Sequence, residues 1–219
     1  RVSNNGIGLF FLYNATININ GASLEANDKG LLFYTYKNSS ASASTGHINI
    51  TGTVNATINA GGTAFYLKDD LSQITNFINN VFTGTGKLNL NMASSDSRLF
   101  ILDSPSNDIY LSSSSSSAIE SLIPSSKVSI TGTGYKPYAV YKGNLIVDQN
   151  VNLDDANDAY NRLDFMSSKT TVNPGITISG TGNNISAIGQ RNYTGTSGRD
   201  EVTVINNGTI KQTGQNVIG

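Results

Sequence analysis

The sequence predicts an all-β fold, a right-handed parallel β-helix with short helical or loop insertions. Three observations predict it: runs that alternate apolar and small polar residues, a recurring glycine-containing motif, and an unusual composition. Asn, Ser, Thr and Gly together supply 98 of the 219 residues, whereas hydrophobic residues make up 37% and charged residues 13%. Both of the latter shares lie below those of an average globular domain. A thin stacked interior needs few large apolar side chains, so the composition fits a solenoid.

Short strands are expected along the whole chain. Apolar and small polar residues alternate at 16–19, 47–50, 87–90, 127–130 and 175–178. Such alternation predicts strands with one buried face. Apolar runs lie between them at 9–12, 31–34, 64–67, 99–102 and 138–141. In a parallel β-helix, equivalent strands stack about 4.8 Å apart, so these runs are expected to pair between coils.

The glycine motif is predicted to mark corners between strands. An apolar residue and a Ser or Thr precede Gly-Thr-Gly at 82–86, 130–134 and 178–182, at intervals of 48 residues. We interpret each interval as two coils of about 24 residues. Glycine suits corners because it adopts positive φ at low cost.

Three insertions are predicted to interrupt the coils, at Asp69–Phe82, Ser104–Pro124 and Asp154–Leu163. The first contains apolar residues at helical spacing, which predicts an amphipathic helix up to Val81, and weaker helical patterns lie in the other two. Six consecutive serines at 112–117 predict a flexible surface loop. Insertions in solenoids often lie on the binding face, so we expect any binding function there.

Several function classes are disfavoured. The net charge of −1 argues against nucleic-acid binding, which needs clustered Lys and Arg. Without cysteine and with His47 as the single histidine, no metal centre, cofactor or catalytic activity is expected. The stretch 148–159 resembles a calcium loop, but Leu153 and Ala159 stand where such a loop needs Gly and Glu. We therefore expect no ordered calcium there.

One surface patch is a candidate for ligand contact. Tyr135, Lys136, Tyr138 and Lys142 lie within eight residues, and exposed tyrosines offer amphipathic contact area. The alternative, which the sequence favours, is that either Tyr138 and Val140 or Ala139 and Tyr141 belong to the inner side of a strand. The two interpretations differ in whether the ring is exposed.

Three segments resemble a known family. Val204–Ile210, with the sequence V-I-N-N-G-T-I, resembles a rung of bacterial autotransporter passenger domains. Residues 62–66 and 143–153 resemble rungs of large fusobacterial (type Va) outer-membrane adhesins. The resemblance implies that residues 1–219 form a single segment of a longer passenger domain at the bacterial outer-membrane surface. It also implies a monomer that adheres to a host cell-surface protein or glycan, or to partner bacteria, without itself contacting a membrane.

Other functions remain open. A passive spacer or stalk would have the same coils but no need of insertions. A glycan-cleaving β-helix enzyme would need chemistry at carboxylates such as Asp69, Asp70 or Asp148. A toxin passenger is a further alternative. An adhesin is the leading interpretation, with the three insertions as its expected binding surface.

Overall fold

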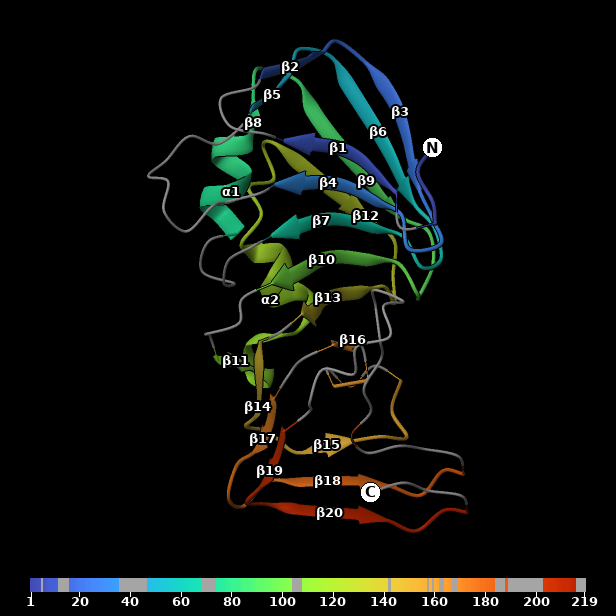
Figure 1. Ribbon diagram of the computed structural model, residues 1–219, viewed down its shortest axis with the longest axis vertical. Coiled ribbons are helices and arrows are strands. Elements are labelled where there is room, and N and C mark those ends of the chain that lie inside the picture. The colour runs from blue at the N-terminus through green and yellow to red at the C-terminus, as the bar shows by residue number, and fades with distance from the viewer. Residues whose placement is uncertain are drawn as a thin grey trace.

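The computed structural model shows a parallel β-helix whose strands stack along the long axis of the molecule (Figure 1). It describes residues 1–4, 6–11, 16–35, 47–67, 74–103, 108–141, 143–156, 158, 160–161, 164–166, 169–183, 188 and 203–215. Every strand pair in this part of the chain is parallel and joins a strand to its equivalent in the next coil. The predicted parallel β-helix is confirmed.

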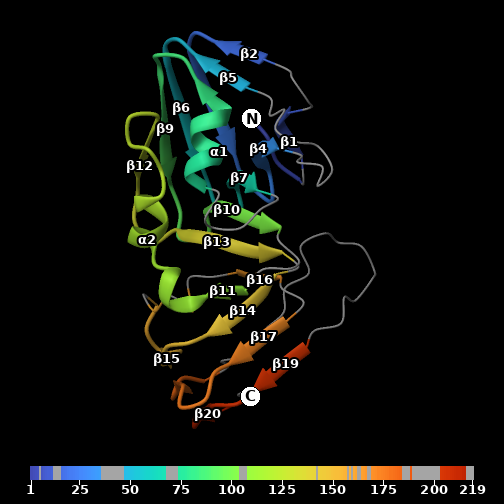
Figure 2. The ribbon, with the colours of Figure 1, turned by 90° about the vertical axis from the view of Figure 1, so that its left-hand side faces the viewer.

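The described strands form five sheets. The six-stranded sheet, called the long sheet below, contains β1 (Ile7–Phe11), β4 (Leu31–Thr35), β7 (Thr63–Leu67), β10 (Arg98–Asp103), β13 (Lys136–Tyr141) and β16 (Asp164–Met166). The N-terminal coils are completed by two sheets: β2 (Thr16–Ile19), β5 (His47–Ile50) and β8 (Phe82–Thr83), and β3 (Ala22–Ala26), β6 (Thr53–Ile58), β9 (Lys87–Met92) and β12 (Val128–Thr131). The C-terminal coils, in the lower half of Figure 2, are completed by two more: β11 (Asp108–Tyr110), β14 (Asn144–Val147), β17 (Lys169–Val172) and β19 (Thr203–Asn206), and β15 (Val151–Asn152), β18 (Thr177–Gly180) and β20 (Thr209–Gln212).

The coils differ in length. Ile7 pairs with Leu31, which pairs with Thr63 in the following coil. Thr63 pairs with Arg98, and Arg98 pairs with Lys136. These differences in residue number give successive coils of 24, 32, 35 and 38 residues. Each coil therefore adds a different length of chain while the strands keep their register.

The 48-residue spacing of the glycine motif does not correspond to a fixed number of coils. The first copy begins with β8, whereas the second begins at Ile130 in β12, in a different sheet. This first interval therefore spans one coil and part of the next, and the two-coil interpretation is wrong for it because an insertion lengthens the coil. The second interval runs from β12 to Ile178 in β18 and passes β13 and β16 of the long sheet, so it does correspond to two coils.

A ladder of aromatic rings runs along the interior of the long sheet. The rings of Phe33 and Phe65 are stacked with centroids 5.4 Å apart, and those of Phe65 and Phe100 are 5.1 Å apart. Tyr138 continues the ladder, since it pairs in register with Phe100. All four side chains are buried. Parallel pairing in register thus places like residues one above another, where their flat rings fill the thin core.

Polar side chains form ladders on the outside of the coils. Asn49 donates a hydrogen bond from Nδ2 to Oδ1 of Asn18 at 2.9 Å, between β5 and β2. Asn89 in β9 donates in the same way to Asn55 in β6 at 3.0 Å, and Ser129 in β12 donates to Asn89 at 2.8 Å. The alternation predicted from the sequence therefore separates apolar side chains inside from uncharged polar ladders outside.

The helix α1 (Ile74–Val81) lies in the first predicted insertion, directly before β8. Its apolar side chains Ile74, Phe77, Ile78 and Val81 are buried. The helix therefore closes part of the interior beside a strand of only two residues, instead of projecting from the solenoid. Within the described part of the chain, neither helix is long and apolar enough to cross a membrane.

The serine run forms ordered structure instead of a surface loop. The 3₁₀ helix η2 (Leu111–Ser113) is followed by α2 (Ser116–Ser121). Ser115 caps α2, because its hydroxyl accepts a hydrogen bond from the Ala118 N–H. Ser114 is buried, and its hydroxyl donates to the Tyr110 carbonyl at 2.7 Å. The loop prediction is wrong because serine composition does not show which hydroxyls find partners in the folded chain.

Two side chains from other coils hold the C-terminal end of α1. His47 Nδ1 lies 2.6 Å from the Asn80 carbonyl oxygen, so this nitrogen carries the proton. Lys127 donates from Nζ to the Asn79 carbonyl at 3.4 Å and also to the Phe82 carbonyl. Helix C-termini leave carbonyl groups without helical partners, and a cation there is favourable. The cap ties α1 to the strands around it.

We expect Lys127→Met to lower the free energy of unfolding by about 1 kcal/mol, because the methionine keeps the stem but removes the ammonium that donates to the Asn79 and Phe82 carbonyls. Urea denaturation followed by circular dichroism measures the change. Lys87→Met, on the outer side of β9, removes an ammonium from a surface position and is the matched control. Equal stabilities of the two variants would show that the cap contributes nothing.

Candidate functional site

The two tyrosines proposed as ligand contacts are instead buried. Tyr138 is 0% and Tyr135 2% exposed. The Tyr138 hydroxyl is hydrogen-bonded to the Ser114 hydroxyl, and the Tyr135 hydroxyl donates to the Glu120 carboxylate. Burial raises the pKa of the Tyr138 phenol well above its ordinary value. Neither ring is available to a ligand at the surface, and Lys142 lies outside the described residues.

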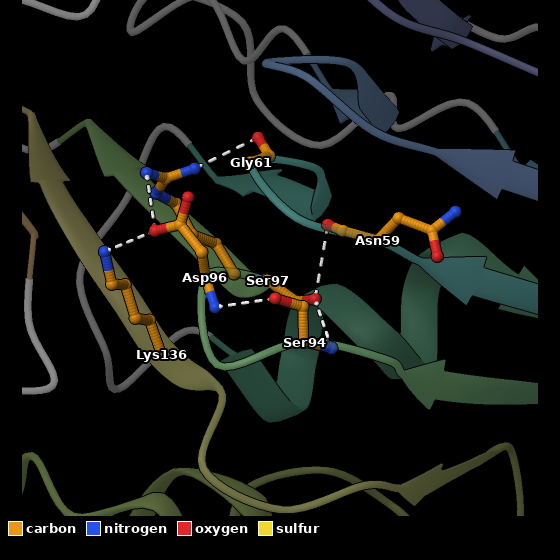
Figure 3. A network of polar contacts seen from close by, with 7 residues as sticks. Asn59, Gly61, Ser94, Asp96, Ser97 and Lys136 are labelled. Atoms are coloured by element: carbon orange, nitrogen blue, oxygen red, sulfur yellow. Dashed lines mark hydrogen bonds and ion pairs between the residues drawn. The ribbon is translucent and has the colours of Figure 1, made fainter.

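Lys136, the remaining residue of that patch, belongs to a corner network (Figure 3). Its ammonium lies 2.7 Å from the Asp96 carboxylate, which also lies 3.9 Å from the Arg98 guanidinium. Arg98 donates to the Gly61 carbonyl at 3.0 Å, and the Ser97 hydroxyl donates to a carbonyl of the preceding coil at 2.6 Å. These contacts join successive coils, so the network has a structural role at this corner.

The described residues form a groove over the sheet of β15, β18 and β20. It has a volume of about 480 Å³. Its lining residues are Asn150, Val151, Asn152, Asp154, Asp158, Ser179, Gly180, Thr181, Lys211 and Thr213. Asn152, Ser179 and Lys211 are in register on the three strands, with the mostly buried Val151, Ile178 and Ile210 beside them on the interior side. The groove is therefore a row of hydrogen-bonding side chains that crosses three coils.

Both carboxylates in the groove are held by backbone donors. Asp154 accepts hydrogen bonds from the Thr181 N–H at 2.7 Å, the Thr181 hydroxyl at 2.8 Å and the Gly182 N–H at 2.8 Å. The Thr181 N–H and hydroxyl, followed by the Gly182 N–H, lower the pKa of Asp154 below its ordinary value. Asp158 accepts from the N–H groups of Asn152 and Tyr160 at 2.8 and 2.9 Å. These bonds fix the positions of both charges.

The Asp154 contacts predict a dependence of stability on pH. A carboxylate whose pKa falls on folding stabilises the fold above the ordinary aspartate pKa of about 3.9, and this contribution is lost as the pH falls through the folded-state pKa. We expect the Asp154→Asn variant to be less stable than wild type at pH 7. The difference in stability between the two should become smaller in acid. Thermal unfolding between neutral and acidic pH tests this, and an equal difference at both ends would contradict the assignment.

In the stretch 148–159, which resembles a calcium loop in sequence, the side-chain oxygens each accept hydrogen bonds from different parts of the chain. Asp148 accepts hydrogen bonds from the N–H and hydroxyl of Ser112 at 2.9 and 2.6 Å. Asn150 accepts from the Thr177 N–H at 2.9 Å, and Asn152 accepts from a main-chain N–H two residues ahead. Among the described residues, no three His, Asp or Glu side chains gather as metal ligands. Asp148 and Asn150 therefore satisfy backbone N–H groups of neighbouring coils, whereas Asn152 satisfies one within its own loop.

Sequence reasoning identified only part of the groove. The third predicted insertion, Asp154–Leu163, supplies Asp154 and Asp158, but Ser179, Lys211 and Thr213 were not singled out. These three lie on later coils and are brought beside Asn152 only by strand pairing. The first insertion contributes α1 to the core, and Asp69 and Asp70 lie outside the described residues.

Comparisons with protein-family models, with curated proteins and with solved structures each find no match for this chain. The site therefore has to be interpreted from its own geometry.

Proposed function

We propose that the chain is a segment of a bacterial cell-surface adhesin, the passenger part of an autotransporter, which attaches non-covalently to host cells or other bacteria. The observation that carries the proposal is the groove of exposed hydrogen-bonding side chains across β15, β18 and β20. The parallel β-helix supports it because a stacked scaffold holds those side chains at fixed positions. The proposal includes no catalytic step.

The chemistry of the groove favours recognition over turnover. Asp154 and Asp158 each accept at least two hydrogen bonds from the chain, which holds them in place and keeps Asp154 ionised. A general acid needs a raised pKa, and the shift at Asp154 has the opposite direction. Fixed donors and acceptors are what selective binding of a polar ligand requires.

A passive spacer is the second candidate, and the position of α1 favours it. The apolar side chains of α1 are buried, so this insertion completes the coil instead of presenting a binding surface. On this alternative the coils would only hold another part of the protein at a distance.

Cell attachment tests the proposal. The purified, fluorescently labelled chain is added to host epithelial or immune cells and to partner bacteria, with free sugars and free amino acids as competitors. We expect saturable attachment that a competitor abolishes. The heat-unfolded chain is the control for non-specific adsorption. A folded chain that shows no saturable attachment would overturn the proposal and favour the spacer.

A further inference from the structure

We propose that the groove over β15, β18 and β20 binds a neutral oligosaccharide, with Lys211, Asn150 and Asn152 as the main hydrogen-bond donors. This inference rests on the proposed function, because it names the ligand class of the same surface. It goes further in assigning the site to three coils and in excluding acidic sugars and protein partners.

The donors follow from the hydrogen bonds already made within the groove. Asn150 and Asn152 each accept a backbone N–H through Oδ1, which leaves the Nδ2 group of each side chain for a ligand. Lys211 is exposed, and within the described part of the chain its ammonium makes no hydrogen bond or ion pair. An ammonium has three donors, so Lys211 offers the strongest unused capacity in the groove.

The acceptors lie beside these donors. A carboxylate offers about four lone-pair positions, of which Asp154 uses three and Asp158 two within the chain. A sugar hydroxyl both donates and accepts, so it can bridge a carboxylate and an amide or ammonium group. Asn152, Ser179 and Lys211 follow one another at the spacing of stacked strands, about 4.8 Å. This row presents hydrogen-bonding groups repeatedly along the molecular axis, as a chain of linked sugars does.

The charges favour a neutral ligand. The lining residues include two carboxylates, Asp154 and Asp158, and one ammonium, Lys211, so the formal charge of the groove is negative. The lowered pKa of Asp154 keeps its charge in place at neutral pH. An acidic sugar would be repelled by both carboxylates, because like charges this close disfavour binding.

The lining also argues against a protein partner. Affinity at protein interfaces is concentrated in aromatic and arginine anchors seated in buried pockets. The residues that line this groove include no aromatic side chain and no arginine. The larger part of the exposed lining of the groove is apolar, and a sugar ring can cover such surface.

The test uses the intact chain on an immobilised array of neutral, sialylated and sulfated oligosaccharides. We expect binding to neutral probes only, reduced roughly tenfold in Lys211→Met, which corresponds to one lost charged hydrogen bond. Ser179→Phe, which fills the groove from its middle strand, should abolish binding. Lys169→Met in β17 removes the same charge from a neighbouring sheet and should bind as wild type. Circular dichroism checks that each variant is folded.

Three outcomes overturn the inference: preference for sialylated or sulfated probes, binding unchanged in folded Lys211→Met and Ser179→Phe, or no binding to any probe. Cell attachment measured in parallel separates this result from the proposed function. Attachment without oligosaccharide binding leaves the adhesin and removes the sugar site. Oligosaccharide binding without attachment supports the sugar site and overturns the adhesin.

Discussion

Replacing Phe65 by alanine is expected to lower the free energy of unfolding by about 3–5 kcal/mol, the range for truncation of a buried phenylalanine. The side chain is 0% exposed and lies between the stacked rings of Phe33 and Phe100. It also meets Phe77 of α1 and Phe82 of β8 edge to face, at 6.0 and 5.8 Å. The substitution therefore removes contacts within the long sheet and also the contacts with α1 and β8.

Chemical denaturation of wild type, Phe65→Ala and Phe65→Leu measures this effect. Leucine keeps most of the apolar volume and loses the ring geometry, so it should fall between the other two. If alanine and leucine were equally stable, the stack would contribute no more than any filled volume. A loss below about 1 kcal/mol for alanine would contradict the central place of this ring in the core.

The second large effect is expected at a corner glycine. A Cβ added at Gly52 would lie 1.5 Å from the Asn20 carbonyl oxygen of the preceding coil. One coil later, a Cβ at Gly86 would lie 2.1 Å from the Gly52 carbonyl oxygen. Backbone carbonyls cannot yield as a flexible side chain can. We therefore expect Gly52→Ala to cost about 3 kcal/mol or more, because it forces successive coils apart at this corner.

Gly175→Ala is the matched control. Gly175 has a φ of +78°, but a Cβ there meets nothing within 4 Å. Alanine at that position should cost only the backbone strain, about 1–2 kcal/mol. Comparison of the two denaturation midpoints separates close approach from positive φ. Gly52 has no positive φ, so a loss at Gly52 no larger than the loss at Gly175 would contradict the close-approach explanation.

The strands could be predicted from the sequence because their signal is local. The five apolar runs all overlap strands of the long sheet, from β1 to β13. The five alternating runs overlap β2, β5, β9, β12 and β18. When apolar and polar residues alternate, the side chains on one face of the strand are apolar and those on the other are polar. Burial of the apolar face follows. Fold class follows from many such short strands without hairpin turns.

The arrangement of those strands could not be predicted, because it depends on residues far apart in the chain. Local alternation allows either Tyr138 or Ala139 to face the interior, and only pairing with Phe100 places Tyr138 in the ladder. The groove depends on Lys211 and Ser179 lying beside Asn152, which strand pairing alone determines. The glycine motif misled for the same reason, since a regular interval in sequence hid coils of unequal length.

The unequal coils determine how the molecule would extend under tension. The hydrogen bonds between coils run along the long axis, so a pull on the two ends of the stack loads one interface at a time, from the ends inward. Each rupture frees a single coil of 24 to 38 residues. At roughly 3.4 Å per residue, the chain would lengthen in steps of roughly 80 to 130 Å. The coils would thus be released one after another, in steps of unequal length. This stepwise release would limit the peak force at the point where the end of the stack is attached.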